Sequence, residues 1–264
     1  MHPKLLEFGD FFLPAYGFFV ALGFLAGMLV AQRLAKRRGL DPELLVGAAL
    51  YTALVGLAGA KLALILQDFS YYSQNPGQLF SLNMLQSAGI FYGGVLAGFA
   101  FFVWYMRKHD IPFAKGADCL APGLAIGHAF GRLGCFFGGC CFGEYCTRPW
   151  AVTFTDPAVR EFSNVPLNVP LHPTQIYESV SEFVIFFVLM ALFGKLTTPG
   201  RILGLFLVLS SLDRFIVEFF RAHDVSNPMG TSLSTAQWTA LALVALGAWF
   251  LTRRPRMEAV RAAR

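Results

Sequence analysis

Long apolar segments separated by short polar stretches are the main pattern of this chain. A membrane-spanning helix needs about 20 mostly apolar residues, and segments of this kind recur along the whole sequence. They run approximately from Phe11 to Ala31, Leu44 to Leu66, Ala88 to Met106, Cys119 to Phe137, Ile176 to Phe193, Ile202 to Phe220 and Thr235 to Leu251. The pattern predicts an all-α polytopic membrane protein of about seven transmembrane helices, forming a single transmembrane domain over residues 1–264.

The basic residues between these segments predict an orientation. Lys and Arg gather after the first, third, fifth and seventh segments, in the ranges 33–38, 107–115, 195–201 and 253–264. By the positive-inside rule these loops are cytoplasmic, so we expect a periplasmic N-terminus and a cytoplasmic C-terminus. Charged residues make up only 14% of the chain, against about 25% in soluble domains. The net charge of +5 is therefore a topology signal and does not indicate a nucleic-acid partner.

Two of the expected outer segments are longer than simple turns, near residues 67–87 and 138–174. The second contains an alternating, strand-like stretch from Trp150 to Thr155, followed by the turn signal Asp156-Pro157. We therefore expect a small β element in this outer loop.

Ionisable residues inside a membrane are costly, so each one suggests a functional role. Ionisable residues within the predicted spans include Lys61, His128, Arg132, Asp213, Arg214 and Glu218. In the predicted orientation they lie in the outer halves of their helices. Tyr16 and Tyr92 lie at about the same depth, near the outer starts of the first and third spans. The agreement in depth predicts a polar cavity that opens toward the outer leaflet.

Two arginines dominate the predicted cavity. Arg132 has no acidic neighbour on its own helix, so we expect it to be unpaired and available to a phosphate, which suits guanidinium geometry. Arg214 and Glu218 are four residues apart, and Glu218 and Arg221 are three apart, so each pair shares a helix face. For Glu218 and Arg221 the alternative is an ion-pair network that only holds helices together.

The histidines and cysteines leave alternatives open. His172 is a candidate base or headgroup contact, or part of a helix start capped by Thr174, and His128 is expected to be structural. Four cysteines near the outer end of the fourth span favour one or two disulfides, with free thiols or a metal site as alternatives. The metal site is disfavoured because there is no Cys-x-x-Cys pair. Those four are Cys135, Cys140, Cys141 and Cys146.

The sequence resembles the prolipoprotein diacylglyceryl transferase family. The motifs that carry the resemblance are Ala15-Tyr16-Gly17, Gly93-Gly94, Gly131-Arg132-Leu133-Gly134 with Phe136 and Gly143, His172 through Glu178, and Arg214 through Asp224. The resemblance implies a seven-helix, multi-pass enzyme of the bacterial inner membrane with its site toward the periplasm. It implies transfer of the diacylglyceryl group of phosphatidylglycerol to the signal-sequence cysteine thiol of prolipoproteins, with formation of a thioether and release of glycerol phosphate.

The resemblance also implies site residues, with no cofactor and no metal. The predicted catalytic residues are Arg132, Arg214 and Glu218, which match the family, and Tyr92, which stands where the family has its base. The implied substrate-binding residues are Arg132, Tyr16, Arg221, His172 and Lys61. The expected partners are phosphatidylglycerol, prolipoprotein signal peptides and membrane lipid.

Several positions depart from the family pattern. Tyr92 stands where the family commonly has its proposed base, a histidine, and Lys61 stands for an arginine. Cys135, Gly138 and Cys140 stand where the family has Asn, Asn and Glu. The base is therefore open between Tyr92, His172 and activation of the thiol by the arginine field alone. A same-fold enzyme with a different acceptor, or a membrane transporter, are the alternative functions, and acyl-chain preference and oligomeric state are not indicated.

Overall fold

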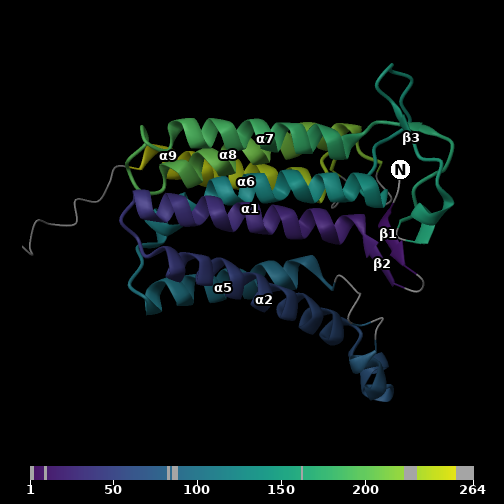
Figure 1. The fold of residues 1–264 in the computed structure, drawn as a ribbon, viewed down its shortest axis with the longest axis horizontal. Helices are drawn as coiled ribbons and strands as arrows, with labels where there is room; N and C mark the ends of the chain where they lie inside the picture. The colour runs from purple at the N-terminus through teal and green to yellow at the C-terminus, as the bar shows by residue number, and fades with distance from the viewer. Residues whose placement is uncertain are drawn as a thin grey trace, which may run out of the picture. The chain divides into compact units, whose positions relative to one another are not determined.

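The computed structural model describes residues 3–8, 11–81, 84, 89–161, 163–222 and 231–253, and these are mostly helical (Figure 1). Each predicted apolar segment corresponds to one long helix. These helices are α1 (Ala15–Arg37), α2 (Pro42–Gln67), α5 (Phe91–Lys108), α6 (Phe113–Gly138), α7 (Thr174–Leu192), α8 (Arg201–Val217) and α9 (Thr235–Thr252). Among the described residues, α1, α2, α7 and α9 are long and apolar enough to cross a membrane. The structure thus confirms an all-α membrane architecture at this level. The basic tail beyond Arg253, and His223 and Asp224 of the last motif, lie outside the described residues.

The first apolar segment begins as a strand, contrary to the prediction. Strand β1 (Lys4–Phe8) pairs antiparallel with β2 (Phe11–Pro14), and α1 starts directly after Pro14. Apolar and aromatic residues suit a strand as well as a spanning helix, so hydrophobicity alone misplaced this boundary. The sixth segment also ends differently: after Val217 the chain tightens into the 3₁₀ turn η3 (Glu218–Phe220).

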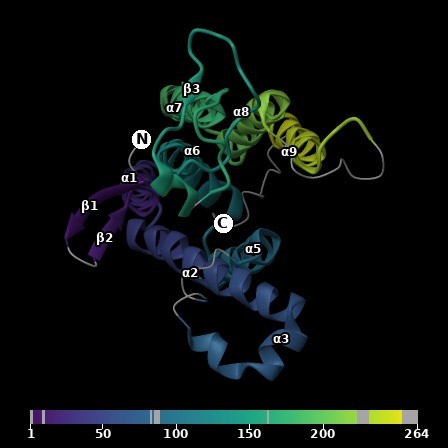
Figure 2. The same cartoon turned by 90° about the vertical axis from the view of Figure 1, so that its right-hand side faces the viewer.

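The chain forms two compact units. One comprises Met1–Ala31 with Ala117–Arg264, and the other comprises Gln32–Gly116. The larger unit is a bundle in which α1 lies alongside α6, α7, α8 and α9, with the helix axes roughly aligned (Figure 1). Figure 2 shows the same helices nearly end-on. The smaller unit contains α2 and α5, together with the short α3 (Phe69–Gln74) and η1 (Pro76–Phe80) of the first expected outer segment. The expectation of a single transmembrane domain stays a prediction.

Glycines allow close helix contacts within the larger unit. A Cβ on Gly27 of α1 would lie 2.7 Å from the carbonyl oxygen of Gly123 on α6, and one on Gly204 of α8 would lie 2.8 Å from that of Gly247 on α9. Such distances leave no room for a side chain, so backbone packs on backbone, as is common between membrane helices.

One buried carboxylate fixes the start of α8. Asp118 of α6 accepts hydrogen bonds from the backbone N–H groups of Gly200, at 2.7 Å, and Leu203, at 2.8 Å. These donors have no partner within their own helix, so Asp118 caps α8 from a neighbouring helix. Gly200 has a φ of +92°, a conformation that glycine adopts at little cost.

The outer loop after α6 has its own small core, and the predicted β element is confirmed there. Strand β3 (Val152–Thr153) pairs antiparallel with β4 (Pro170–Leu171), and the 3₁₀ turn η2 (Pro157–Glu161) follows the predicted Asp-Pro turn. The buried side chains of this core are Phe154, Val159, Val165 and Leu171. The loop is therefore a folded element that can hold side chains rigidly near the helix ends.

Candidate functional site

A fully buried carboxylate on α7 joins the two arginines that the sequence singles out. Oε2 of Glu178 lies 2.9 Å from Nε of Arg132 on α6, and Oε1 lies 3.3 Å from Nη1 of Arg214 on α8. Glu178 is in the second turn of α7, while both arginines are near the last turns of their helices. Antiparallel neighbours bring these ends together, so the three side chains meet at one end of the larger unit.

A second carboxylate extends this cluster. Oε2 of Glu218 lies 2.6 Å from Nη2 of Arg214 and 3.7 Å from Nε of Arg221, which confirms both ion pairs expected from the spacing. Its Oε1 accepts a hydrogen bond of 2.7 Å from the hydroxyl of Ser234, the N-cap of α9. Glu218 thereby connects the end of α8 to the start of α9.

The ion pairs of this cluster join three guanidinium groups to two carboxylates, so these five groups together carry a net positive charge. The carboxylates of Glu178 and Glu218 are buried, whereas the side chains of Arg132, Arg214 and Arg221 are 15%, 26% and 18% exposed. The carboxylates are therefore shielded from the surface, whereas part of each arginine side chain is exposed. Such an arrangement can bind a further anionic group.

A histidine and a third acid lie one turn deeper. Nδ1 of His128 is 2.9 Å from Oε1 of the fully buried Glu182, and Nε2 of His128 accepts a hydrogen bond of 3.1 Å from Nε of Arg132. Ser210 of α8 donates to the same Glu182 oxygen. His128 thus positions Arg132, a role that agrees with its expected structural one.

Tyr16 and His172 border the cluster in different ways. The backbone of Tyr16, in the first turn of α1, lies close to Gly134, two residues beyond Arg132. A Cβ on Gly134 would lie 3.1 Å from the carbonyl oxygen of Tyr16. His172 contacts Tyr177 through Nδ1, at 3.0 Å from the phenol oxygen, and its ring packs on Phe220. Its backbone also bonds the outer loop, which indicates that His172 holds the loop on the helix ends.

Lys61 and Tyr92 belong to the smaller unit. Lys61 of α2 donates a hydrogen bond to the carbonyl oxygen of Met84. Tyr92 lies in the first turn of α5 and is exposed. The N–H of Ile90 bonds the carbonyl oxygen of Ala60 at 2.9 Å, so both side chains are at the same end of the α2–α5 pair. The prediction that five spans share one polar cavity stays a prediction for these two.

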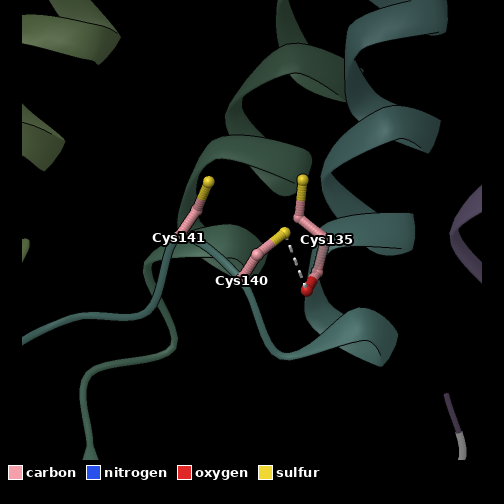
Figure 3. Close-up of side chains that lie close together, drawn as sticks. All are labelled: Cys135, Cys140 and Cys141. Carbon is pink, nitrogen blue, oxygen red and sulfur yellow. Dashed lines mark hydrogen bonds between the residues drawn. The ribbon is translucent and has the colours of Figure 1, made fainter. Parts of the chain in front are cut away.

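Three cysteine thiols converge beside the arginines. The sulfur atoms of Cys135, at the end of α6, and of Cys140 and Cys141, in the loop that follows, lie within 4.8 Å of one another (Figure 3). No disulfide joins any of the five cysteines, all of which lie in the described part of the chain, so the predicted disulfides are wrong. Hydrogen bonds from the Cys135 and Cys140 thiols, together with the charges of Arg221 and Arg132, lower the pKa of Cys141.

The start of α7 anchors this cysteine loop. The Thr174 hydroxyl donates to the carbonyl oxygen of Cys141 at 2.8 Å, and the Gln175 amide donates to that of Cys140 at 2.7 Å. Thr174 does not cap α7 through its side chain, so the alternative of a helix start capped by Thr174 is wrong. Its hydroxyl serves the loop because the loop folds back over the helix start.

The structure also corrects the prediction that Arg132 is unpaired, which considered only the residues of its own helix. Arg132 is paired, because Glu178 and His128 both reach its Nε. The acids Glu178 and Glu182 are missing from the predicted site, although two carboxylates four residues apart in an apolar segment are an available signal. Both lie on the face of α7 that packs against α6 and α8.

The fold and this site define a class: a helical membrane protein with a cationic, ion-paired centre at the ends of packed helices. The family model described as "Prolipoprotein diacylglyceryl transferase" matches residues 3–253. The chain therefore belongs to the prolipoprotein diacylglyceryl transferase family, and the resemblance expected from the motifs is confirmed.

Relatives from distant bacteria agree. The chain is 32% identical over 247 residues to the phosphatidylglycerol–prolipoprotein diacylglyceryl transferase of Clostridium tetani, covering 94% of this chain and 95% of the relative. The protein of that name from Nitratidesulfovibrio vulgaris (strain DP4) is 32% identical over 258 residues, covering 94% and 93%. The one from Nostoc sp. is 29% identical over 273 residues, covering 99% and 94%.

Proposed function

We propose that this protein transfers the diacylglyceryl group of phosphatidylglycerol to the cysteine thiol of prolipoproteins, the activity in the names of its relatives. The observation that carries the proposal is the cluster of three guanidinium groups around two buried carboxylates. An anionic phospholipid headgroup supplies the missing negative charge, and a zwitterionic one satisfies it less well.

In this proposal Arg132 and Arg214 bind the phosphate of phosphatidylglycerol and stabilise it as it leaves. Negative charge grows on the phosphate oxygen as the bond to the glyceryl carbon breaks, and positioned cations lower the energy of that state. Glu178 supports this role because it fixes both guanidinium groups from one buried point. Arg221 and Glu218 complete the field, and Tyr16 and Lys61 contact the lipid substrate.

We further propose that all seven long helices span the bacterial inner membrane, with a periplasmic N-terminus and a cytoplasmic C-terminus. The alternation of basic loops supports this orientation. The cluster then lies toward the periplasmic side, where phosphatidylglycerol and a prolipoprotein signal peptide reach it from the membrane.

Two side chains are proposed as the base for the acceptor thiol. A thiol with a pKa of about 8.5 needs only modest help near neutral pH. Tyr92 occupies the position where the family has its base. His172 is the alternative, although its contacts with Tyr177 and Phe220 favour a structural role. Lipid transfer by a Tyr92→Phe variant tests whether Tyr92 is the base. Full activity of this variant would exclude Tyr92 as the base.

Complementation of a bacterial strain that lacks the transferase tests the function. The wild-type chain is expected to restore growth and lipid labelling of a prolipoprotein, and Arg132→Ala is expected to fail at equal protein levels. Turnover of labelled phosphatidylglycerol without a prolipoprotein would show a different acceptor. If the chain shows neither complementation nor turnover, the proposal is overturned and the transporter alternative remains.

A further inference from the structure

The three converging thiols are close enough together to bind one metal ion. Cys140 is tied to Cys135 by a backbone hydrogen bond of 3.1 Å, and its Sγ lies 3.8 Å from the same carbonyl oxygen. Figure 3 shows the three sulfur atoms gathered between the end of α6 and the loop. Sulfur ligands of a tetrahedral zinc ion lie about 3.8 Å apart, given Zn–S bonds of about 2.3 Å. Small side-chain rotations therefore bring thiols that lie within 4.8 Å of one another onto one ion.

The backbone of the loop is strained where it presents these thiols. Cys141 has a φ of +60°, in the left-handed region that residues with a Cβ rarely adopt. Such a conformation is unfavourable for a residue with a Cβ and persists only where the surroundings impose it. Here the fully buried Thr174 and Gln175 impose it, through hydrogen bonds to the carbonyl groups of Cys141 and Cys140. The fold holds this loop in one arrangement, and that arrangement directs the thiols toward each other.

The charges around the thiols suit a bound metal. Zinc with three thiolates carries one net negative charge, and Arg132 and Arg221 both interact electrostatically with Cys141. Thiolates select thiophilic ions over magnesium or calcium. Within the described part of the chain, no fourth His, Cys, Asp or Glu joins the group. A site with three protein ligands keeps its fourth position open, as catalytic zinc sites do.

We propose that Cys135, Cys140 and Cys141 bind a zinc ion whose open position takes the sulfur of the acceptor cysteine. The proposal rests on the transferase function proposed above and identifies how this chain activates its thiol substrate.

The chemistry balances without an added oxidant or reductant. Binding to zinc removes the proton of the acceptor thiol, which passes to water at the outer surface, and a metal-bound thiol is deprotonated outright. The zinc-bound sulfur then forms a bond to the glyceryl carbon of the lipid. The bond from that carbon to the phosphate oxygen breaks, and the oxygen keeps the electron pair as glycerol phosphate leaves. The product thioether is a neutral, weaker ligand, so it dissociates, and zinc keeps its oxidation state.

The metal content of the purified full-length protein tests the site. We expect about one zinc per chain by elemental analysis, and cobalt substitution should give thiolate-to-cobalt charge-transfer absorption. Cys140→Ser and Cys141→Ser should each lose the metal and that absorption. Cys146→Ser is the matched control, because Cys146 is a buried cysteine of the same outer loop outside the trio, and it should keep both. Absence of metal from the wild type after reconstitution, or a disulfide of Cys135 that forms and persists with full activity, overturns the proposal.

Lipid transfer by the metal-free protein separates this inference from the proposed function. Removal of zinc by a chelator is expected to lower the transfer rate at least about 100-fold, and added zinc should restore it. Unchanged transfer by the metal-free protein refutes the role of zinc and leaves the transferase function standing. Failure of the zinc-loaded wild type to transfer lipid refutes the transferase function, while the metal analysis still decides whether the site exists.

Discussion

Oε2 of Glu178 lies 2.9 Å from Nε of Arg132, and the carboxylate that makes this contact is fully buried. The same carboxylate reaches Arg214, so one acidic group on α7 holds two cationic groups from α6 and α8. Removing one partner of a buried ion pair is far more damaging than never having made it, because a desolvated charge is left behind. This relationship makes Glu178 the most sensitive position of the site.

Replacing Glu178 by Gln should therefore impair both stability and activity. The amide keeps the shape but leaves two guanidinium groups without their counter-charge, which costs about 3–5 kcal/mol in buried pairs. We expect a lower midpoint of thermal unfolding in detergent and a transfer rate reduced at least about 100-fold. Glu144→Gln, at an exposed loop position, is the control and should behave like the wild type. Equal behaviour of the two variants would contradict this account.

Arg132 should not tolerate lysine. Lysine keeps the positive charge but lacks the Nε group that contacts Glu178 and His128, and it lacks the planar fork of donors that the proposed phosphate contact uses. We expect Arg132→Lys to lose about 100-fold in kcat and Arg132→Ala to lose at least as much. Steady-state transfer assays on purified protein measure this, and a lysine variant at wild-type rate would show that charge alone suffices.

Gly143 should be intolerant of any side chain. A Cβ there would lie 2.5 Å from the carbonyl oxygen of Phe220 and 2.6 Å from that of His172. Gly143 also forms a β-bridge with Arg221, so a shift of the loop moves a cation of the site. Gly143→Ala should abolish most transfer activity. Gly131→Ala, where a Cβ meets nothing within 4 Å, should leave the thermal unfolding midpoint unchanged or raise it slightly.

Asp118→Ala tests the cap of α8 from α6. The variant loses hydrogen bonds to two backbone N–H groups, so its free energy of unfolding should fall by about 1–2 kcal/mol. Asp68→Ala is the matched control, because Asp68 precedes α3 without a side-chain cap bond. Thermal unfolding in detergent compares the two, and an equal loss in both would show that the Asp118 cap contributes nothing specific.

Local patterns predicted much of the molecule. The apolar segments predicted every long helix in the described part of the chain, and the spacing of Arg214, Glu218 and Arg221 predicted their ion pairs. The same reasoning missed the β1–β2 hairpin, because Phe11 to Pro14 is apolar in either conformation. It also missed Glu178 and Glu182, which look like isolated acids within an apolar helix until their partners on other helices are known.

The sequence by itself determined the helices and the residue types of the site, because the length of an apolar run and the cost of a buried charge are local properties. Only the tertiary structure decided which charges pair and which thiols meet. Arg132 and Glu178 are on different helices, and Cys141 reaches Cys135 because buried Thr174 and Gln175 hold the loop. Such contacts depend on how helices pack, and no spacing along one helix encodes them.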